Sequence, residues 1–90
     1  MESLKDKVVI ITGASSGIGE ATARMLIENK SKVMLAARRE RKLKDICDEL
    51  GKNSAYFVTD IANHSNVLEM AEETINTFGQ VDVLVNNAGI

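Results

Sequence analysis

Four short apolar segments alternate with three helical patterns along the chain. The apolar segments cover residues 8–11, 32–37, 54–58 and 81–85. Every position from Val8 to Ile11 is apolar, which is typical of a strand buried on both faces of a sheet. A strand with one face in water would alternate apolar and polar residues. We therefore expect four strands, with the first one fully buried.

The segments between these strands repeat apolar residues every three or four positions, as one face of a helix does. The first helix is expected from about residue 18 to residue 29, with a buried face formed by Ile18, Ala21, Thr22, Met25 and Leu26. The second has Gly51 as a C-cap candidate and an apolar face of Leu43, Ile46, Cys47 and Leu50. The third has Asn63 as a candidate N-cap, Gly79 at its end, and an apolar face of Val67, Met70, Ala71, Thr74, Ile75 and Phe78.

This alternation predicts an α/β fold, a Rossmann-type doubly wound parallel sheet with the element order βαβαβαβ and the strand order 3-2-1-4. The first two helices should cover one face and the third helix the other, because the chain reverses direction between strands 3 and 4. That reversal opens a crevice at the C-terminal ends of strands 1 and 4, where ligands bind in such sheets. One helix on the second face and an open edge at strand 4 make the sheet incomplete. We expect residues 1–90 to be the N-terminal half of one larger domain.

The composition excludes several classes of protein. The 90 residues are 44% hydrophobic and 27% charged with a net charge of −2, so no strong field favours nucleic acid or a membrane surface. No apolar run approaches the roughly 20 residues of a membrane span, and no signal-peptide core follows Met1. The single Cys47 excludes an internal disulfide and suits a reducing compartment. These features predict a cytoplasmic protein that binds neither nucleic acid nor membrane.

The stretch from Thr12 to Gly19 reads Thr-Gly-Ala-Ser-Ser-Gly-Ile-Gly and lies between the first strand and the first helix. A strand, a glycine turn and a helix form a context in which the backbone can wrap a phosphate group. The glycines permit close approach, and the free N–H groups and dipole of the helix start favour an anion. The spacing is Gly-x-x-x-Gly-x-Gly, and no Gly-Lys-Ser/Thr follows, so the stretch is not a P-loop. The topology also brings Asn86-Asn87-Ala88-Gly89, which ends the fourth strand, to the same crevice.

Three motifs in this order closely resemble the N-terminal half of the short-chain dehydrogenases/reductases: the stretch from Thr12 to Gly19, then Asp60, then the four residues from Asn86. The resemblance extends from about Leu4 to Ile90. It implies the N-terminal half of one NAD(P)-binding Rossmann domain, in an oxidoreductase that transfers hydride between nicotinamide and a carbonyl or secondary alcohol. It also implies a small-molecule substrate and a homo-oligomer.

The resemblance implies a cofactor-binding role for each matching residue. The pyrophosphate and the adenosine ribose would be wrapped by Gly13, Ala14, Ser15, Ser16, Gly17, Ile18 and Gly19; the two serine hydroxyls could bind phosphate or only be solvated. Asp60 and Ile61 would flank adenine, with the Asp60 carboxylate accepting from the exocyclic amine; the alternative is a turn carboxylate that caps local N–H groups. Backbone contacts to the riboses would come from Asn87, Ala88 and Gly89. Structural roles are assigned to Thr12, Asp82 and Asn86.

The residues after the second strand indicate the choice of cofactor. A site selective for NAD usually has an Asp or Glu at the end of this strand, which holds the ribose 2′-hydroxyl. Here Ala37 takes that position, and Arg38 and Arg39 follow. A guanidinium can bind the 2′-phosphate of NADP through bidentate hydrogen bonds. We therefore predict NADP(H) over NAD(H), with Arg38 as the main contact and Arg39 stacking on adenine or assisting. The alternative is that the basic run from Lys30 to Lys44 is a solvated helix flank.

The catalytic groups that the resemblance implies, a Ser and a Tyr followed four residues later by Lys, are not found in the 90 residues. The only tyrosine, Tyr56, has Asp60 four residues on and lies in the expected third strand. We expect the catalytic residues beyond Ile90 and no hydride transfer by the 90 residues alone. His64 and Cys47 have no partner at metal-ligand spacing, so no metal is expected. Two alternatives are a non-catalytic NADP-binding module and a half-domain that self-associates.

Overall fold

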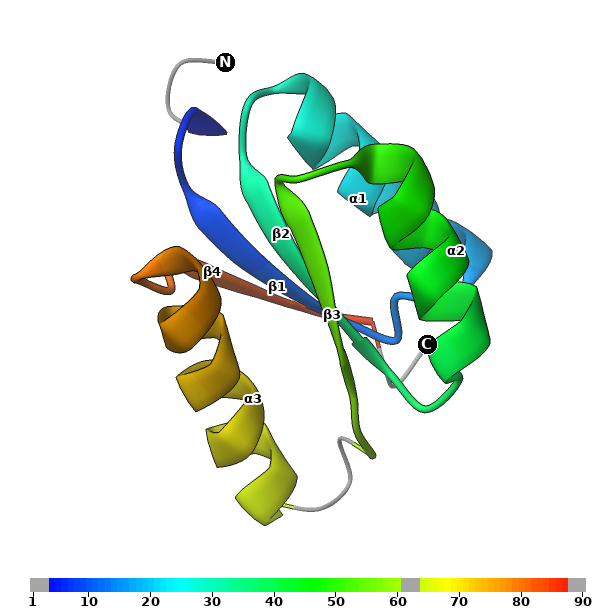
Figure 1. Ribbon diagram of the computed structural model, residues 1–90, viewed down its shortest axis with the longest axis vertical. Helices are drawn as coiled ribbons and strands as arrows, with labels where there is room; N and C mark the ends of the chain where they lie inside the picture. The colour runs from blue at the N-terminus through cyan, green and yellow to red at the C-terminus, as the bar shows by residue number, and fades with distance from the viewer. Residues whose placement is uncertain (1–3, 61–63, 88–90) are drawn as a thin grey trace.

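The computed structural model describes residues 4–60 and 64–87. Strands and helices alternate along these residues, as predicted (Figure 1). The strands are β1 (Val8–Thr12), β2 (Lys32–Ala37), β3 (Ser54–Val58) and β4 (Val83–Asn86). The helices are α1 (Gly17–Glu28), α2 (Glu40–Leu50) and α3 (His64–Phe78). The predicted N-cap of the third helix, Asn63, lies outside the described residues.

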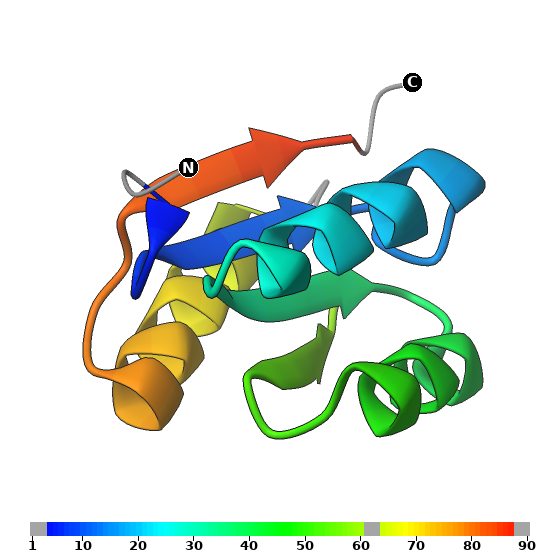
Figure 2. The ribbon, with the colours of Figure 1, turned by 90° about the horizontal axis from the view of Figure 1, so that it is seen from above.

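The four strands form one parallel sheet in the order β3-β2-β1-β4, which confirms the predicted topology. In the middle of the sheet, Ile10 of β1 is level with Met34 of β2 and Leu84 of β4. Helices α1 and α2 pack on one face and α3 packs on the other (Figure 1 and Figure 2). Because all four strands are parallel, the loops that follow them leave the sheet at the C-terminal ends of the strands. This end is called here the sheet edge, and it differs from the outer edge of the sheet along β4.

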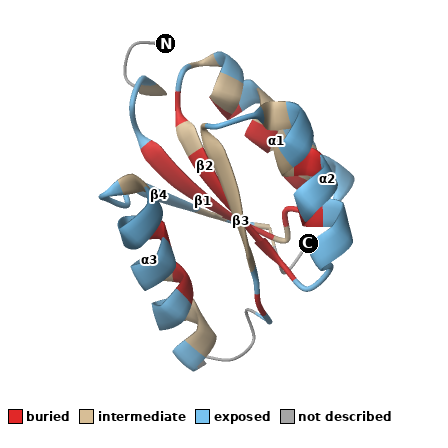
Figure 3. Cartoon of the chain, viewed as in Figure 1, coloured by how far each residue is buried: buried red, intermediate tan, exposed pale blue. Residues whose placement is uncertain are grey.

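Two apolar clusters, one on each face of the sheet, hold the layers together. Successive residues of a strand point to opposite faces, so Val9 and Ile11 join the cluster under α1 and α2, whereas Ile10 joins the cluster under α3. Leu43 of α2 and Met70 of α3 complete the two clusters and are buried. Burial is concentrated in β1 and β2 (Figure 3). Each fully buried aliphatic side chain contributes about 1.5–3 kcal/mol, so these two strands account for much of the stability of the fold.

The face that α1 turns toward the sheet differs from the prediction. Ile18 and Met25 are 58% and 49% exposed, whereas Gly19, Ala23 and Leu26 are buried. The apolar pattern predicted that the larger side chains would be buried, but two of the three residues that α1 buries are small. Small residues let the helix backbone lie close to the strands beneath it, so here close approach decides the packing face. The predicted face is therefore wrong except for Leu26.

Helix α2 confirms its predicted face and C-cap. Leu43 and Ile46 are buried, and Cys47 and Leu50 pack against the same cluster. Gly51 has a φ of 91°, and its N–H donates to the carbonyl of Cys47 at 2.9 Å. Glycine adopts this left-handed backbone without strain, which explains why the helix ends here.

The predictions for α3 and β4 need two corrections. Met70 and Thr74 of α3 are buried as expected, but Ile75 is 50% exposed because α3 stands over β2 and β3 and leaves one flank uncovered. Strand β4 begins at Val83, two residues after its predicted start. The strand starts late because the N–H of Val8 donates to the side-chain carboxylate of Asp82 at 2.8 Å, and not to a backbone carbonyl as in a regular strand pair.

The outer edge of β4 is open among the described residues, and Val83 and Leu84 are 42% and 51% exposed. An edge strand without charged side chains pairs readily with other chains. None of the helices within the described ranges has both the length and the apolar character needed to cross a membrane.

Candidate functional site

The glycine turn joins the end of β1 to the start of α1. Gly13 has a φ of 63°, a left-handed conformation that glycine adopts at little cost, and its carbonyl accepts the N–H of Ser16 at 3.1 Å. The N–H of Ala14 donates to the carbonyl of Ala36 at 3.3 Å, which ties the turn to the end of β2. The turn is therefore a defined structure that rests on two neighbouring strands.

Two further glycines of this turn have opposite surroundings. A Cβ atom on Gly19 would lie 2.7 Å from the Cα of Ala14 and 2.7 Å from the carbonyl oxygen of Gly13, too close for any side chain. A Cβ atom on Gly17 would have no neighbour within 4 Å. Gly19 thus lets α1 pack against the turn, whereas Gly17 leaves the first turn of the helix open to an approaching group. An open backbone with free N–H groups at a helix start is suited to an anion.

Ser16 is the N-cap of α1, and its Oγ accepts the N–H of Gly19 at 3.1 Å. The sequence reading treated Ser15 and Ser16 only as possible phosphate donors and missed this cap. The available signal was a serine placed directly before the first helical residue. Ser16 is exposed and Ser15 is partly buried. A hydroxyl oxygen that accepts from the helix can still donate its own hydrogen to a ligand, so both functions are compatible in Ser16.

Arg38 and Arg39 follow β2 directly, and both are exposed. The last residue of the strand, Ala37, is 9% exposed, so the two guanidinium groups begin where the buried strand ends. Arg39 is also the N-cap of α2, and its side chain makes no capping hydrogen bond. The two arginines and the start of α2 are called here the positively charged corner, although Glu40, the first residue of α2, adds one carboxylate to it.

The end of β3 carries a buried polar group and an exposed one. The N–H of Thr59 donates to the carbonyl of Ala37 at 2.9 Å, but its Oγ1 is buried without a hydrogen-bond partner in the described part of the chain. Asp60 is exposed, and its backbone carbonyl accepts Nδ2 of Asn66 at 3.2 Å. Asp60 therefore lies at the same sheet edge as Arg38. Its predicted neighbour Ile61 lies outside the described residues.

The end of β4 is tied to β1 through side chains. The hydroxyl of Thr12 donates to Oδ1 of Asn86 at 2.8 Å and accepts the N–H of Asn87 at 3.1 Å. These bonds agree with the structural roles predicted for Thr12 and Asn86. Nδ2 of Asn87 is buried and finds no partner among the described atoms. Predicted site residues Ala88 and Gly89 fall beyond residue 87 and are not described.

The sheet edge thus collects every predicted site residue that the structure describes. The glycine turn follows β1, Arg38 and Arg39 follow β2, Asp60 follows β3, and Asn87 follows β4. The geometry offers open helix N–H groups, two cations and a carboxylate along one edge, a set that suits an extended anionic ligand with a polar ring. Within residues 4–60 and 64–87, no three His, Cys, Asp or Glu side chains lie together as a metal site would need.

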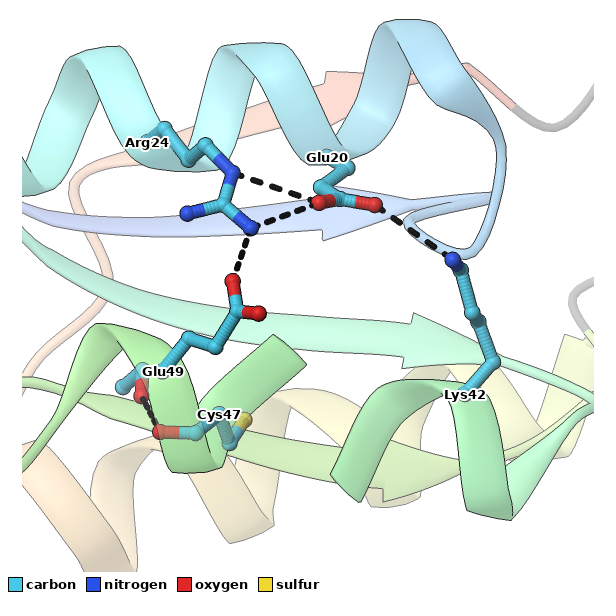
Figure 4. A network of polar contacts seen from close by, with 6 residues as sticks. Glu20, Arg24, Lys42, Cys47 and Glu49 are labelled. Atoms are coloured by element: carbon cyan, nitrogen blue, oxygen red, sulfur yellow. Dashed lines mark hydrogen bonds and ion pairs between the residues drawn. The ribbon is translucent and has the colours of Figure 1, made fainter. Parts of the chain in front are cut away.

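A network of ion pairs connects residues of α1 with residues of α2 (Figure 4). Arg24 donates to Oε2 of Glu20 through Nε at 3.2 Å and through a terminal nitrogen at 2.7 Å, and it also pairs with Glu49. Nζ of Lys42 lies 3.5 Å from Oε1 of Glu20. The hydrogen bond from Arg24 and the charge of Lys42 lower the pKa of Glu20, and Glu49 and Glu20 raise the pKa of Arg24. The sequence reading missed this network, although Glu20 and Arg24 have the i, i+4 spacing of a helix ion pair.

The chain is similar to known proteins along nearly its whole length. A family model described as short chain dehydrogenase matches residues 7–90. The uncharacterized oxidoreductase YxnA of Bacillus subtilis is 46% identical over 93 residues, which cover 100% of this chain and 26% of that protein. An uncharacterized oxidoreductase of Staphylococcus saprophyticus is 47% identical over 91 residues, which cover 100% of this chain and 37% of that protein.

Two solved structures are similar in fold. A 3-ketoacyl-(acyl-carrier-protein) reductase from Brucella melitensis, complexed with NADH, has a TM-score of 0.86 at 32% identity over 90% of this chain and 34% of its own. A short chain dehydrogenase from Bacillus anthracis has a TM-score of 0.87 at 33% identity over 94% of this chain and 35% of its own. The chain therefore spans only about a third of the length of these proteins.

Proposed function

The chain belongs to the short chain dehydrogenase family, and from that premise we propose that it forms the NADP(H)-binding part of an oxidoreductase. The hydride would pass between the nicotinamide and a small carbonyl compound or secondary alcohol. The observation that carries the proposal is the position of Arg38, which directly follows the buried end of β2 at the same sheet edge as the glycine turn.

The residues of the turn fit a dinucleotide. The open space at Gly17 and the free N–H groups of the first turn of α1 would hold the pyrophosphate. Asp60 would accept from the adenine amine, and the segment from Asn87 would line the riboses. The buried Nδ2 of Asn87 supports this assignment, because a buried donor without a partner is costly unless a ligand satisfies it.

The preference for NADP(H) rests on the residues after β2. The reductase from Brucella melitensis is complexed with NADH, so a fold of this kind accepts a cofactor that has no 2′-phosphate. We therefore assign the choice of cofactor to side chains. Ala37 provides no carboxylate to hold a 2′-hydroxyl, and the exposed guanidinium groups of Arg38 and Arg39 would bind a 2′-phosphate instead.

We also propose that the 90 residues bind the cofactor without carrying out hydride transfer. Tyr56 lies in β3, and its hydroxyl donates to Oε2 of Glu40 at 3.5 Å, on the side of α2. It is not followed by a lysine at the fourth position, where Asp60 stands.

We further propose that the protein is cytoplasmic and forms a homo-oligomer. The exposed apolar edge of β4 favours self-association of the 90 residues when they are produced alone.

Binding measurements test the function directly. The 90-residue chain is titrated with NADPH and with NADH, and cofactor fluorescence reports the two dissociation constants. We expect NADPH to bind more tightly by at least about tenfold, the contribution of one charge-assisted hydrogen bond. Equal or tighter binding of NADH would show that the assignment of Arg38 is wrong. Oxidation of NADPH by this chain in the presence of carbonyl compounds would contradict the proposed lack of catalysis, and light scattering reports self-association.

A further inference from the structure

Glu20 places a carboxylate in the first turn of α1, the turn that the cofactor phosphates would face. Its backbone N–H donates to the carbonyl of the N-cap Ser16 at 2.9 Å, so Glu20 stands one turn from the cap. A carboxylate here suits the helix dipole when no ligand is bound. It opposes the binding of a second anion at the same place unless nearby cations neutralise it.

Two cations, Arg24 and Lys42, neutralise the Glu20 carboxylate to different extents. Arg24 grips Oε2 of Glu20 from one turn further along α1, but it divides its charge between Glu20 and Glu49. Lys42 approaches the other oxygen, Oε1, from α2, and Glu20 is its one ion-pair partner among the described residues. Figure 4 shows Lys42 reaching across from α2 to the side of Glu20 that Arg24 leaves open.

Lys42 is also near the positively charged corner in the sequence. It is the third residue of α2, and it follows the N-cap Arg39 by three positions. The pair of Lys42 and Glu20 therefore bridges the starts of α1 and α2, which flank the proposed position of the 2′-phosphate.

We propose that Lys42 is a specificity-determining residue that favours NADP(H) over NAD(H) by neutralising Glu20; this inference rests on the proposed function. NADPH and NADH share the pyrophosphate, so an effect of Glu20 on that group cancels in the ratio of the two affinities. The 2′-phosphate is present in NADPH alone and would lie between the two helix starts. Exposed charges act over about 10 Å at 0.1 M salt and about 30 Å at 0.01 M. Without Lys42, Glu20 would be paired only with Arg24, which also pairs with Glu49, and the remaining negative charge would repel the 2′-phosphate.

The test compares Lys42→Ala with Lys42→Arg, Glu20→Gln and the double variant Glu20→Gln/Lys42→Ala. Lys44→Ala is the matched control, because Lys44 is an exposed lysine on the same helix. Dissociation constants for NADPH and NADH are measured by fluorescence at low salt, and thermal unfolding verifies that each variant folds. We expect Lys42→Ala to lower the preference for NADPH by about two- to fivefold, the upper part of the range for an exposed ion pair.

The remaining variants identify the mechanism. Lys42→Arg and Lys44→Ala should keep the wild-type preference, and Glu20→Gln should restore it in the Lys42→Ala background. A Lys42→Ala preference equal to that of Lys44→Ala overturns the inference. So does a loss that persists without Glu20, because Lys42 would then act on the phosphate itself. If the wild-type chain binds NADH as well as NADPH or binds neither, the proposed function fails first and the inference fails with it.

Discussion

The hydroxyl of Thr12 lies 2.8 Å from Oδ1 of Asn86, although 74 positions separate the two residues in the chain. Thr12 is 1% exposed, and the same oxygen accepts the N–H of Asn87. One buried hydroxyl thus connects the end of β1 to the segment that leaves β4, beside the glycine turn.

Replacing this hydroxyl tests its contribution to stability. Thr12→Val keeps the shape of the side chain but removes the hydroxyl that donates to Oδ1 of Asn86 and accepts the N–H of Asn87. We expect a loss of about 1–3 kcal/mol in the free energy of unfolding, measured with urea. Thr12→Ser keeps the hydroxyl and is the control. A Thr12→Val variant as stable as the wild type would mean that the hydrogen bonds contribute nothing net.

The two glycines of the turn should respond in opposite ways to alanine. In Gly19→Ala the new methyl group would meet backbone atoms at 2.7 Å, so we expect a loss of about 1–3 kcal/mol in stability. In Gly17→Ala the methyl group meets nothing, and stability should stay equal or rise by up to about 1 kcal/mol. The same methyl group would occupy the proposed place of the pyrophosphate. Gly17→Ala should therefore fold normally and bind NADPH more weakly, and normal binding would argue against that placement.

Arg38 is expected to carry most of the selectivity for the 2′-phosphate. Arg38→Ala should weaken NADPH binding by about 10- to 100-fold, because one or two charge-assisted hydrogen bonds are lost. NADH binding should change by less than about threefold, since only screened surface charge is removed. Arg41→Ala is the matched control, as Arg41 is an exposed arginine in the first turn of α2. An equal loss of both cofactors in Arg38→Ala would assign Arg38 to a group that the two share.

The stability of the fold should depend on pH through Asp82. The N–H of Val8 and the side chain of Gln80 donate to this carboxylate and lower its pKa below the ordinary value. A depressed pKa means that the unfolded chain takes up a proton first as the pH falls. The stabilisation is therefore complete above the ordinary Asp pKa of about 3.9 and is lost as the pH falls through the lower folded-state value.

Asp82→Asn removes the charge and keeps one acceptor oxygen. This variant should unfold at a lower urea concentration than the wild type at pH 7, and the gap should close as the pH approaches about 2. Asp45→Asn, an exposed position on α2, is the control. A gap that is the same at both pH values would show that the effect of Asp82 is not due to its charge.

The strand order, and the placement of the candidate residues after the strands at one end of the sheet, could be predicted because both follow from patterns that are local in the sequence. The buried run of β1 and the glycine turn each signal one structure, and parallel crossovers leave few arrangements open. The face of α1 could not be read in this way, because Gly19 and Ala23 are buried for their small size rather than for hydrophobicity. The pairing of Lys42 with Glu20 depends on the distance between two helices, which no spacing within one helix reveals.

The pairing of β1 with β4 also has a consequence for the order of folding. Val9 is level with Val33 on one side and with Val83 on the other, so one neighbour is close in sequence and the other is remote. Closing the longer loop costs more chain entropy, and contacts of long sequence separation slow folding. We expect β1, β2 and β3 to assemble first and β4 to dock last, which pulsed hydrogen exchange would detect as late protection of the Leu84 amide. A cofactor that spans the ends of β1 and β4 would then bind only molecules in which β4 has docked. Its binding would therefore stabilise the docked position of β4.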